Sequence, residues 1–351
     1  MIQYVDNCSF KKSLSIIEQY IGESVIIEPL AGGLVNRFSN EEDSIFRLKT
    51  SQKNYFFKTN NSNQNIKKYF EDAFAKVDIK CNITDVLNLY SLLPGIKESK
   101  IYDFFSSIKI DCIPSVYLIL VDSTNEKSYI LMEDLSTYFF YDYLENICPS
   151  YSELILAVET LATIHNLFYE QKTYEEINEL HILSSIKFDD NIQYFKDAIK
   201  YISNSEYGFF TTQWGNIFDE VANAFKVIDK NEKILSQNDF SLRNTCFDST
   251  HNLVKVFDWD LCCIQNPEFD LVEYLIFLPI PLEKERFYNL INIYREKSIR
   301  YKNFKNFMDC FRANIFWFIA YKWNIFSMLG GLDKKIIARM AKNISIYLSY
   351  I

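Results

Sequence analysis

An aspartate and an asparagine five residues apart, Asp239 and Asn244, have the residue types and spacing of a kinase catalytic loop. In such a loop the carboxylate accepts the proton of an attacking hydroxyl, and the asparagine binds a magnesium ion. The spacing alone is weak, because short motifs arise by chance in a chain rich in asparagine. A polar loop that satisfies its own turns has the same pattern, so the pair needs support from neighbouring sequence.

Asp258 supplies that support. It follows Asn244 by fourteen residues and comes directly after the apolar run 253–257, which predicts a strand. A carboxylate at a strand end, beside an Asp/Asn loop, provides the oxygen ligands that Mg²⁺ prefers. We therefore predict that Asp239 is the catalytic base and that Asn244 and Asp258 bind Mg²⁺.

A lysine and a glycine pair near the start of the chain are candidates for phosphate contacts. Lys58 ends a strand-like run, where its ammonium can meet phosphate oxygens, although an exposed lysine at a strand end has the same pattern. Gly32 and Gly33 precede a predicted hairpin, and their amides can approach phosphates with no side chain in the way. A glycine pair is also an ordinary turn, so this assignment depends on the other motifs.

The elements that must position these residues divide into two parts. The first 135 residues mix strand-like and helix-like runs, and the rest reads as mostly helix. We predict strands at 26–30, 44–49, 54–58, 116–121 and 129–132, helices at 65–77, 84–93 and 150–168, a hairpin of 245–248 with 253–257, and helices after 272. This pattern predicts a nucleotide-binding lobe over 1–135, and a helical lobe over 136–351 with the catalytic loop and substrate-binding helices.

Composition and charge argue against several classes of protein. The 351 residues are 48% hydrophobic and 24% charged, which is typical of a globular, water-soluble chain. The net charge of −9 argues against nucleic acid as a partner, and apolar stretches far shorter than about 20 residues argue against a membrane span. Charges among the first twenty residues predict no signal peptide. Eight cysteines without metal-site spacing predict reduced thiols in a cytoplasmic protein.

The order of these motifs resembles that of the aminoglycoside phosphotransferase and choline kinase group, small-molecule kinases that share the protein-kinase fold. The resemblance is carried by residues 30–33, 57–58, Pro114, 130–136, 161–165, the Asp239/Asn244 loop, 257–260 and 266–271. It implies an α+β fold with a small N-terminal lobe, containing an antiparallel sheet, and a larger helical C-terminal lobe. It also implies that ATP or GTP binds between the lobes, with its base against the backbone of Glu133, Asp134 and Leu135, and that its γ-phosphate passes to a hydroxyl.

Departures from the pattern of this family leave alternatives open. The family usually has His-Gly before the catalytic aspartate, where this chain has Gln237-Asn238. The acid that should pair with Lys58 is undetermined, since neither Glu71 nor Asp85 lies in clean register. A pseudokinase that only binds nucleotide is one alternative. A protein kinase is another, which the absence of an activation-loop element after Asp258 argues against.

The acceptor is the hardest feature to predict. The segment 170–233 has twelve acidic residues against seven lysines, and negative charge attracts cations. This favours an amine-bearing small molecule, such as an aminoglycoside-like antibiotic or a choline-like metabolite, and hence a resistance kinase or a metabolic one. We expect Asp260 and Glu268 to face this substrate, with a solvated surface position as the alternative for both.

Overall fold

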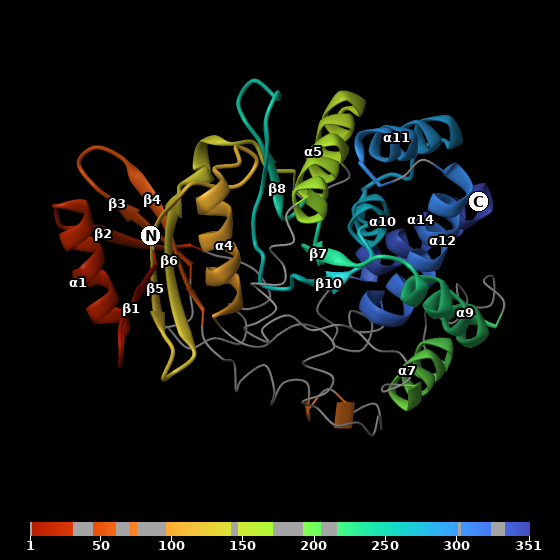
Figure 1. The fold of residues 1–351 in the computed structure, drawn as a ribbon, viewed down its shortest axis with the longest axis horizontal. Helices are drawn as coiled ribbons and strands as arrows, with labels where there is room; N and C mark the ends of the chain where they lie inside the picture. Colours follow the sequence, from red (N-terminus) through yellow and green to blue (C-terminus); the bar gives the residue numbers. More distant parts are fainter. Residues whose placement is uncertain are drawn as a thin grey trace.

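A sheet and a group of helices form the two parts of the structure (Figure 1). The computed structural model describes residues 2–30, 45–60, 71–72, 74–75, 96–141, 147–170, 192–204, 216–300, 303–323 and 334–351. Gly32, Gly33 and most of the helices predicted at 65–77 and 84–93 lie outside these residues. The same is true of parts of the acid-rich segment.

The sheet has six strands in the order β1-β5-β6-β4-β3-β2. Only β1 and β5 are parallel, so the sheet is antiparallel apart from one edge. The strands predicted before residue 135 are all present within one or two residues of their expected ends, whereas β1 was not predicted because it has only three residues. The strands are β1 Ile2–Tyr4, β2 Ile26–Leu30, β3 Ile45–Lys49, β4 Asn54–Asn60, β5 Val116–Asp122 and β6 Lys127–Glu133.

Each face of the sheet is covered by a helix, and alternate residues of the strands point to each face. In β5, Leu118 and Leu120 pack in the core beneath α1 (Phe10–Ile21), whereas Ile119 and Val121 pack on the side of α4 (Lys97–Ile108). Figure 1 shows α1 on the outer side of the sheet and α4 on the side of the helical part. The helix α4 therefore lies between the sheet and the rest of the molecule, where it can contribute to both.

The second part begins after β6, with a short 3₁₀ turn, η2 (Leu135–Thr137). Two small two-stranded sheets lie among its helices: β7 pairs with β10, and β8 forms a hairpin with β9. The predicted helix at 150–168, the late hairpin and the helical C-terminus are all confirmed. The elements are α5 Tyr151–Glu170, α7 Ile192–Asn204, α9 Ile217–Lys230, β7 Ile234–Ser236, β8 Thr245–Phe247, β9 Val254–Val256, β10 Cys263–Gln265, α10 Glu268–Phe277, α11 Lys284–Lys297, α12 Phe304–Phe318, the π-helical turn η4 Ile319–Trp323, and α14 Lys334–Tyr350.

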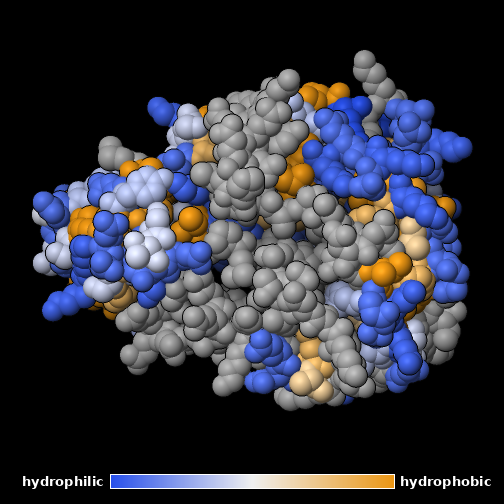
Figure 2. Space-filling view, turned by 60° about the horizontal axis from the view of Figure 1, so that its bottom comes forward, coloured by the Kyte–Doolittle hydropathy of each residue, from blue (hydrophilic) through white to orange (hydrophobic). Residues whose placement is uncertain are grey.

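The hydrophobic residues are concentrated inside this structure. All ten residues of α10 are buried, which places this helix at the centre of the helical part. Figure 2 shows a face on which the described residues are mostly hydrophilic, with hydrophobic residues in small separate groups. Within the described part of the chain, no helix combines the length and apolar character needed to cross a membrane.

Glu153, near the start of α5, forms hydrogen bonds with three segments of the structure. Its backbone N–H donates to the Ser150 hydroxyl and its carboxylate accepts from the Ser150 N–H, so the pair forms the capping box that begins the helix. The buried carboxylate also accepts from the Tyr141 hydroxyl, at 2.7 Å, and lies 2.5 Å from Nδ1 of His251. Burial raises the pKa of Glu153, but these hydrogen bonds outweigh it and hold the pKa below its usual value. The segment after β6, the helix α5 and the β8–β9 turn thus depend on one carboxylate.

We expect Glu153→Ala to lower the free energy of unfolding by about 2 kcal/mol or more, because it leaves several buried donors without an acceptor. Since the native pKa is lowered, the contribution of Glu153 is present above about pH 4.5 and is lost in more acidic solution. Urea unfolding at pH 7 and pH 3.5 measures this. The control Glu159→Ala removes a half-exposed acid of the same helix, 3.5 Å from Lys297, and should change stability by less than about 0.5 kcal/mol. Equal losses in the two variants, or a loss that is independent of pH, would contradict the assignment.

Candidate active site

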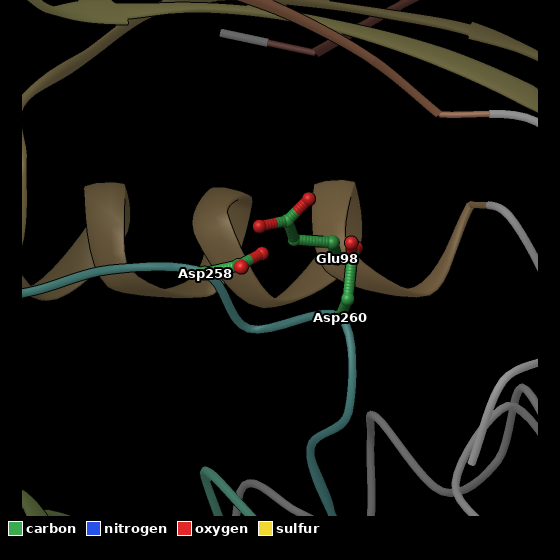
Figure 3. A group of neighbouring side chains, drawn as sticks. All are labelled: Glu98, Asp258 and Asp260. Carbon is green, nitrogen blue, oxygen red and sulfur yellow. The ribbon is translucent and has the colours of Figure 1, made fainter. Parts of the chain in front are cut away.

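Lys58 lies at the centre of a group of three carboxylates. It occupies β4, where the alternation of the strand turns Phe57 toward the α1 face and Lys58 toward α4 and the helical part. Its ammonium is 2.8 Å from Glu98, 2.6 Å from Asp258 and 2.9 Å from Asp260. Figure 3 shows the three carboxyl groups close together, Glu98 on α4 and both aspartates on the loop after β9.

This group carries more negative than positive charge. Burial lowers the pKa of Lys58, but the three carboxylates outweigh it and raise the pKa well above its ordinary value. Burial and the negative charge of Asp260 raise the pKa of Glu98 to about 8. The single charge of Lys58 is shared among the three carboxyl groups, which lie 2.6 to 2.9 Å from its ammonium, and offsets only part of their negative charge. Carboxylate oxygens in excess over one ammonium are a set of donors that suits a hard divalent cation.

Glu98 is the acid that pairs with Lys58, which the sequence alone did not identify. Of the two acids considered there, Glu71 is exposed and Asp85 lies outside the described residues. The signal for a helix that carries Glu98 is present in the sequence: Ile101, Tyr102 and Phe105 recur at helical spacing after a Pro-Gly pair and are buried in α4. Glu98 lies in the first turn of that helix, where its backbone position is fixed.

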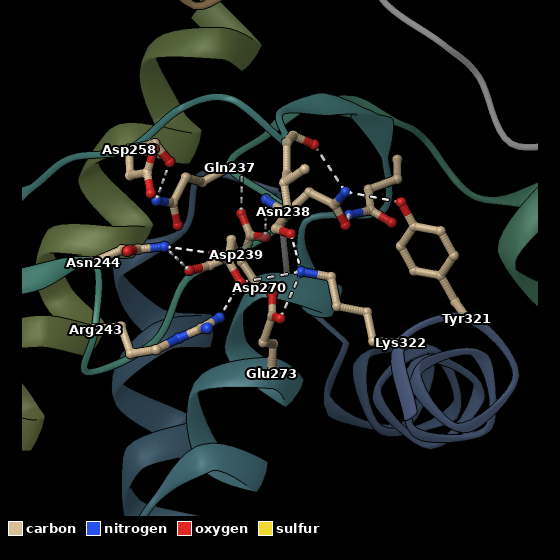
Figure 4. A network of polar contacts seen from close by, with 12 residues as sticks. Gln237, Asn238, Asp239, Arg243, Asn244, Asp258, Asp270, Glu273, Tyr321 and Lys322 are labelled. Carbon is tan, nitrogen blue, oxygen red and sulfur yellow. Dashed lines mark hydrogen bonds and ion pairs between the residues drawn. The ribbon is translucent and has the colours of Figure 1, made fainter. Parts of the chain in front are cut away.

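The predicted catalytic loop places Asp239 and Asn244 side by side (Figure 4). The Asn244 side-chain amide donates to Asp239 Oδ2 at 2.7 Å and to the Asp239 carbonyl at 2.9 Å. Arg243 donates to Asp239 Oδ1 at 2.9 Å, and Lys322 approaches the same oxygen at 3.3 Å. Burial raises the pKa of Asp239, but the two cations and Asn244 outweigh it, so the pKa lies below its usual value. Asp239 is thus held as a carboxylate.

Asp258 lies next to this loop, at the end of the strand predicted for it. The Phe257 N–H donates to the Asn244 carbonyl at 3.1 Å, and the Gln237 side chain donates to the Phe257 and Asp258 carbonyls at 2.7 and 3.1 Å. Burial raises the pKa of Asp258, Lys58 opposes it, and the negative charges of Asp260 and, less strongly, Asp239 add to the rise. The structure therefore brings Asp239, Asn244 and Asp258 into one site, and it joins that site to Lys58.

The backbone of the loop is anchored from α10. The two oxygens of the Asp270 carboxylate accept from the N–H groups of Gln237 and Asn238, at 2.9 and 2.8 Å. His165 lies 3.1 Å from the same carboxylate through Nε2, and its Nδ1 is 2.6 Å from the Tyr294 hydroxyl. All of these groups are buried, so the Gln237-Asn238 pair has a fixed backbone although the side chains differ from the family pattern.

The conformation of Asn238 explains why asparagine can replace glycine there. Its φ is +59°, in the left-handed region that favours glycine. Asparagine is among the few other residues that adopt this conformation readily. Its side-chain amide also donates to the Leu261 carbonyl at 2.8 Å and to the Tyr321 hydroxyl at 3.0 Å. The substitution therefore preserves the turn that precedes Asp239.

Glu133, Asp134 and Leu135 lie where β6 leaves the sheet. The Glu133 carboxylate accepts from the Ser115 N–H at 3.0 Å and pairs with Lys255 at 3.2 Å. Asp134 caps η2 and pairs with Arg47 at 3.0 Å, and the side chain of Leu135 is buried. Both acidic side chains therefore hold this connection in place, and contact of the backbone here with a nucleotide base stays a prediction.

The two acids expected to face the substrate lie in different environments. Asp260 contacts Lys58 in the group described above. Glu268 is fully buried in the first turn of α10, and neither of its carboxylate oxygens has a hydrogen-bond partner. Burial raises the pKa of Glu268 to about 7, with Arg300 as the charged group that opposes it. The structure does not bring Glu268 to Lys58 or Asp239, and a solvated surface position is excluded for it by its burial.

Comparison with known structures identifies the fold. A choline kinase from Streptococcus pneumoniae matches with a TM-score of 0.52 over 95% of this chain and 99% of that chain, at 13% identity. An ethanolamine kinase from Plasmodium vivax matches at 0.56, with 93% and 84% covered and 13% identity. The GDP complex of aminoglycoside 2′-phosphotransferase-IIIa matches at 0.58, with 96% and 98% covered and 12% identity. At such identities the likeness establishes the fold alone, and it confirms the predicted α+β, protein-kinase-like architecture.

The fold is thus that of the small-molecule kinases. A model of the ecdysteroid kinase-like family matches residues 100–302, more than half of the chain, and the chain belongs to this family. It is a phosphotransferase that uses an alcohol group as acceptor, as the sequence predicted. A search among curated proteins gave no match.

Glu268→Gln should stabilise the protein in neutral and alkaline solution. The native pKa of about 7 lies above the ordinary value near 4.5. The neutral carboxyl therefore stabilises the fold fully below about pH 4.5, and this contribution is lost as the pH rises through 7. Glutamine stays neutral, so the variant should exceed the wild type by about 2 to 3 kcal/mol at pH 8 and match it near pH 4.5.

Urea unfolding between pH 4.5 and pH 8 measures this difference. Glu296→Gln, at a side chain 71% exposed on α11, is the matched control and should show no such trend. Parallel pH dependences for wild type and Glu268→Gln would show that Glu268 is not a neutral buried acid.

Proposed function

We propose that the chain transfers the γ-phosphate of ATP or GTP directly to a hydroxyl of a small molecule. In this mechanism Asp239 orients the hydroxyl and receives its proton, and Asn244 and Asp258 are the residues that would hold Mg²⁺. The observation that carries the proposal is that the loop with Asp239 and Asn244, the strand end with Asp258, and Lys58 meet in a single site. In such chemistry the protein mainly positions the reactants and neutralises charge.

The donors present fit a magnesium ion. Asn244 offers an amide oxygen and Asp258 a carboxylate, and the carboxylate of Asp260 lies close to that of Asp258. These are hard ligands of the kind that Mg²⁺ takes, and no thiol or imidazole is needed. When bound, the ion would neutralise charge on the phosphate oxygens. Its charge would also offset the excess of negative charge around Lys58.

Lys58 is the residue that we assign to the nucleotide phosphates. Its ammonium is oriented by Glu98, 2.8 Å away, and the strand that carries it is paired on both sides. Structures of the same fold contain nucleotides: aminoglycoside 2′-phosphotransferase-IIIa was solved with GDP and a spectinomycin phosphotransferase with AMP, at a TM-score of 0.52 and 10% identity for the latter. We place the nucleotide base against the backbone of Glu133–Leu135, between a lobe of residues 1–135 and a lobe of residues 136–351.

We further propose an amine-bearing acceptor in a cytoplasmic protein, with antibiotic resistance or metabolism as its setting. The similar structures include kinases named for choline, ethanolamine and aminoglycosides, which all carry an amino or quaternary ammonium group. The acid-rich segment 170–233 supports the same class, because negative charge attracts cationic substrates.

Catalytic transfer is favoured over a pseudokinase that only binds nucleotide. The reason to consider the pseudokinase was the Gln237-Asn238 pair before Asp239. Asp270 holds the backbone of both residues, and Asn238 has the left-handed conformation that the turn requires. With Gln237-Asn238 in place of His-Gly, Asn244 still contacts Asp239, and Asp258 is still close enough to interact with Asp239 electrostatically.

The proposal predicts phosphate transfer to at least one hydroxylated amine, and Asp239→Asn should lower that turnover by at least about a hundredfold because it removes the proton acceptor. The panel contains choline, ethanolamine, kanamycin and an ecdysteroid, each with Mg-ATP and with Mg-GTP, and phosphorylated product is measured by mass spectrometry. Asp229→Asn, at an exposed acid of α9, is the control and should keep wild-type turnover. Mg-ATP binding by calorimetry without product from any acceptor would favour the pseudokinase, and near-wild-type turnover by Asp239→Asn would remove Asp239 from its role.

Asp258→Asn should lower turnover by at least about a hundredfold for a different reason, the loss of a metal carboxylate. It should also weaken the dependence of nucleotide affinity on Mg²⁺, which calorimetry with ATP in magnesium and in EDTA measures. The Asp239→Asn variant serves as the comparison, because it should lose turnover and keep the magnesium dependence. The same magnesium dependence in wild type and Asp258→Asn would overturn the metal assignment.

A further inference from the structure

A buried lysine from the far end of the chain contacts the proposed base. Lys322 is 3% exposed, and its ammonium lies 3.3 Å from Asp239 Oδ1 and 2.7 Å from Glu273. It also donates to the Asn238 carbonyl. Figure 4 shows Lys322 reaching the loop from the side opposite Asn244. None of the motifs that predict the active site includes this residue, which follows Asp239 by 83 positions.

The helix that carries Lys322 changes its winding at this point. After α12, residues Ile319–Trp323 form a π-helical turn, a rare local widening that occurs frequently at functional sites. Tyr321 and Lys322, which are adjacent in this turn, both contact Asn238, Tyr321 through its hydroxyl and Lys322 through its ammonium. Adjacent residues of a regular α-helix point about 100° apart, so they do not normally meet the same residue. The turn thus delivers two side chains to the residue before Asp239.

The charges around Lys322 indicate that its position is specific. Glu273 is fully buried, and Lys322 holds one of its carboxylate oxygens while the other has no hydrogen-bond partner. Lys322 thus lies between Glu273 and Asp239, and Arg243 contacts Asp239 as well. A buried ion pair is weak support for stability, because the loss of hydration offsets much of the attraction. The presence of such a cluster at the proposed base therefore points to a role in orienting it.

The contacts assign different tasks to the two oxygens of Asp239. Arg243 and Lys322 both lie on Oδ1, which offers two lone-pair directions. The Asn244 amide donates to one lone pair of Oδ2, and the second lone pair of that oxygen can accept from another donor. We propose that Lys322 is a positioning residue, which fixes the Asp239 carboxylate so that Oδ2 faces the acceptor hydroxyl. This inference rests on the proposed function, since it concerns how the base of that reaction is oriented.

The test uses Lys322→Met combined with Glu273→Gln, so that neither buried charge is left without its partner. We expect turnover of Mg-ATP, measured with water and with any acceptor that the panel identifies, to fall by ~10- to 100-fold, because small misplacement of a reacting group has effects of that size. The KM for Mg-ATP should change by less than about twofold, because Lys322 contacts none of the groups assigned to the nucleotide. A crystal structure of the variant should show the Asp239 carboxylate rotated away from Asn244.

Arg312→Met combined with Glu220→Gln is the matched control. It removes an ion pair of 3.5 Å from α12, the same helical segment, at side chains about 40% exposed. Unchanged turnover in the control with reduced turnover at constant KM in the Lys322 variant supports the positioning role. Wild-type turnover in the Lys322 variant, or loss of turnover together with Mg-ATP affinity, overturns it. If the wild type shows no turnover at all, the proposed function fails, and the Asp239 side chain in the variant crystal structure still decides the positioning role.

Discussion

The contact of Lys58 with three carboxylates is the interaction on which the site depends. It joins β4 of the sheet, the first turn of α4 and the loop after β9, which are separated by 40 to 202 positions in the chain. No hydrophobic contact could fix these three segments with the same directional accuracy, because apolar packing is not directional. The helix α4 allows these segments to come together, because it packs on the sheet while Glu98 in its first turn accepts from the Trp259 N–H of the loop after β9. The position of Lys58 therefore depends on the packing of both parts of the molecule.

The second constraint is that the loop with Asp239 and Asn244 must be held from within the helical part. The turn before Asp239 carries an asparagine in the left-handed conformation, and a buried carboxylate on α10 accepts from two successive N–H groups of this turn. Asp270 is in turn contacted by His165 of α5, which is contacted by Tyr294 of α11. Buried polar groups of this kind are costly unless every member has a partner. The network consequently links the packing of three helices to the geometry of one loop.

Much of this arrangement could be predicted from the sequence, because the signals are local. The hairpins, the helix at 150–168 and the pairing of Asp239 with Asn244 all depend on residues close together in the chain. Glu98 was missed although its helix has a clear periodicity, because nothing local indicates that a residue 40 positions away will meet Lys58. The same reason hides Lys322. Glu268 shows a further difficulty, since an acid at the start of a helix is usually solvated, and only the tertiary structure reveals that this one is enclosed.

The charge balance at Asp239 is compatible with how phosphoryl transfer proceeds. A carboxylate contacted by Arg243 and Lys322 has a lowered pKa and is a weaker base than an isolated one. A strong base is not required, because the transition state of such a transfer is loose and the attacking oxygen forms little bond to phosphorus at that stage. Orientation of the hydroxyl then matters more than removal of its proton. The proposed base, with a carboxylate held by three neighbouring side chains and a lowered pKa, suits that requirement.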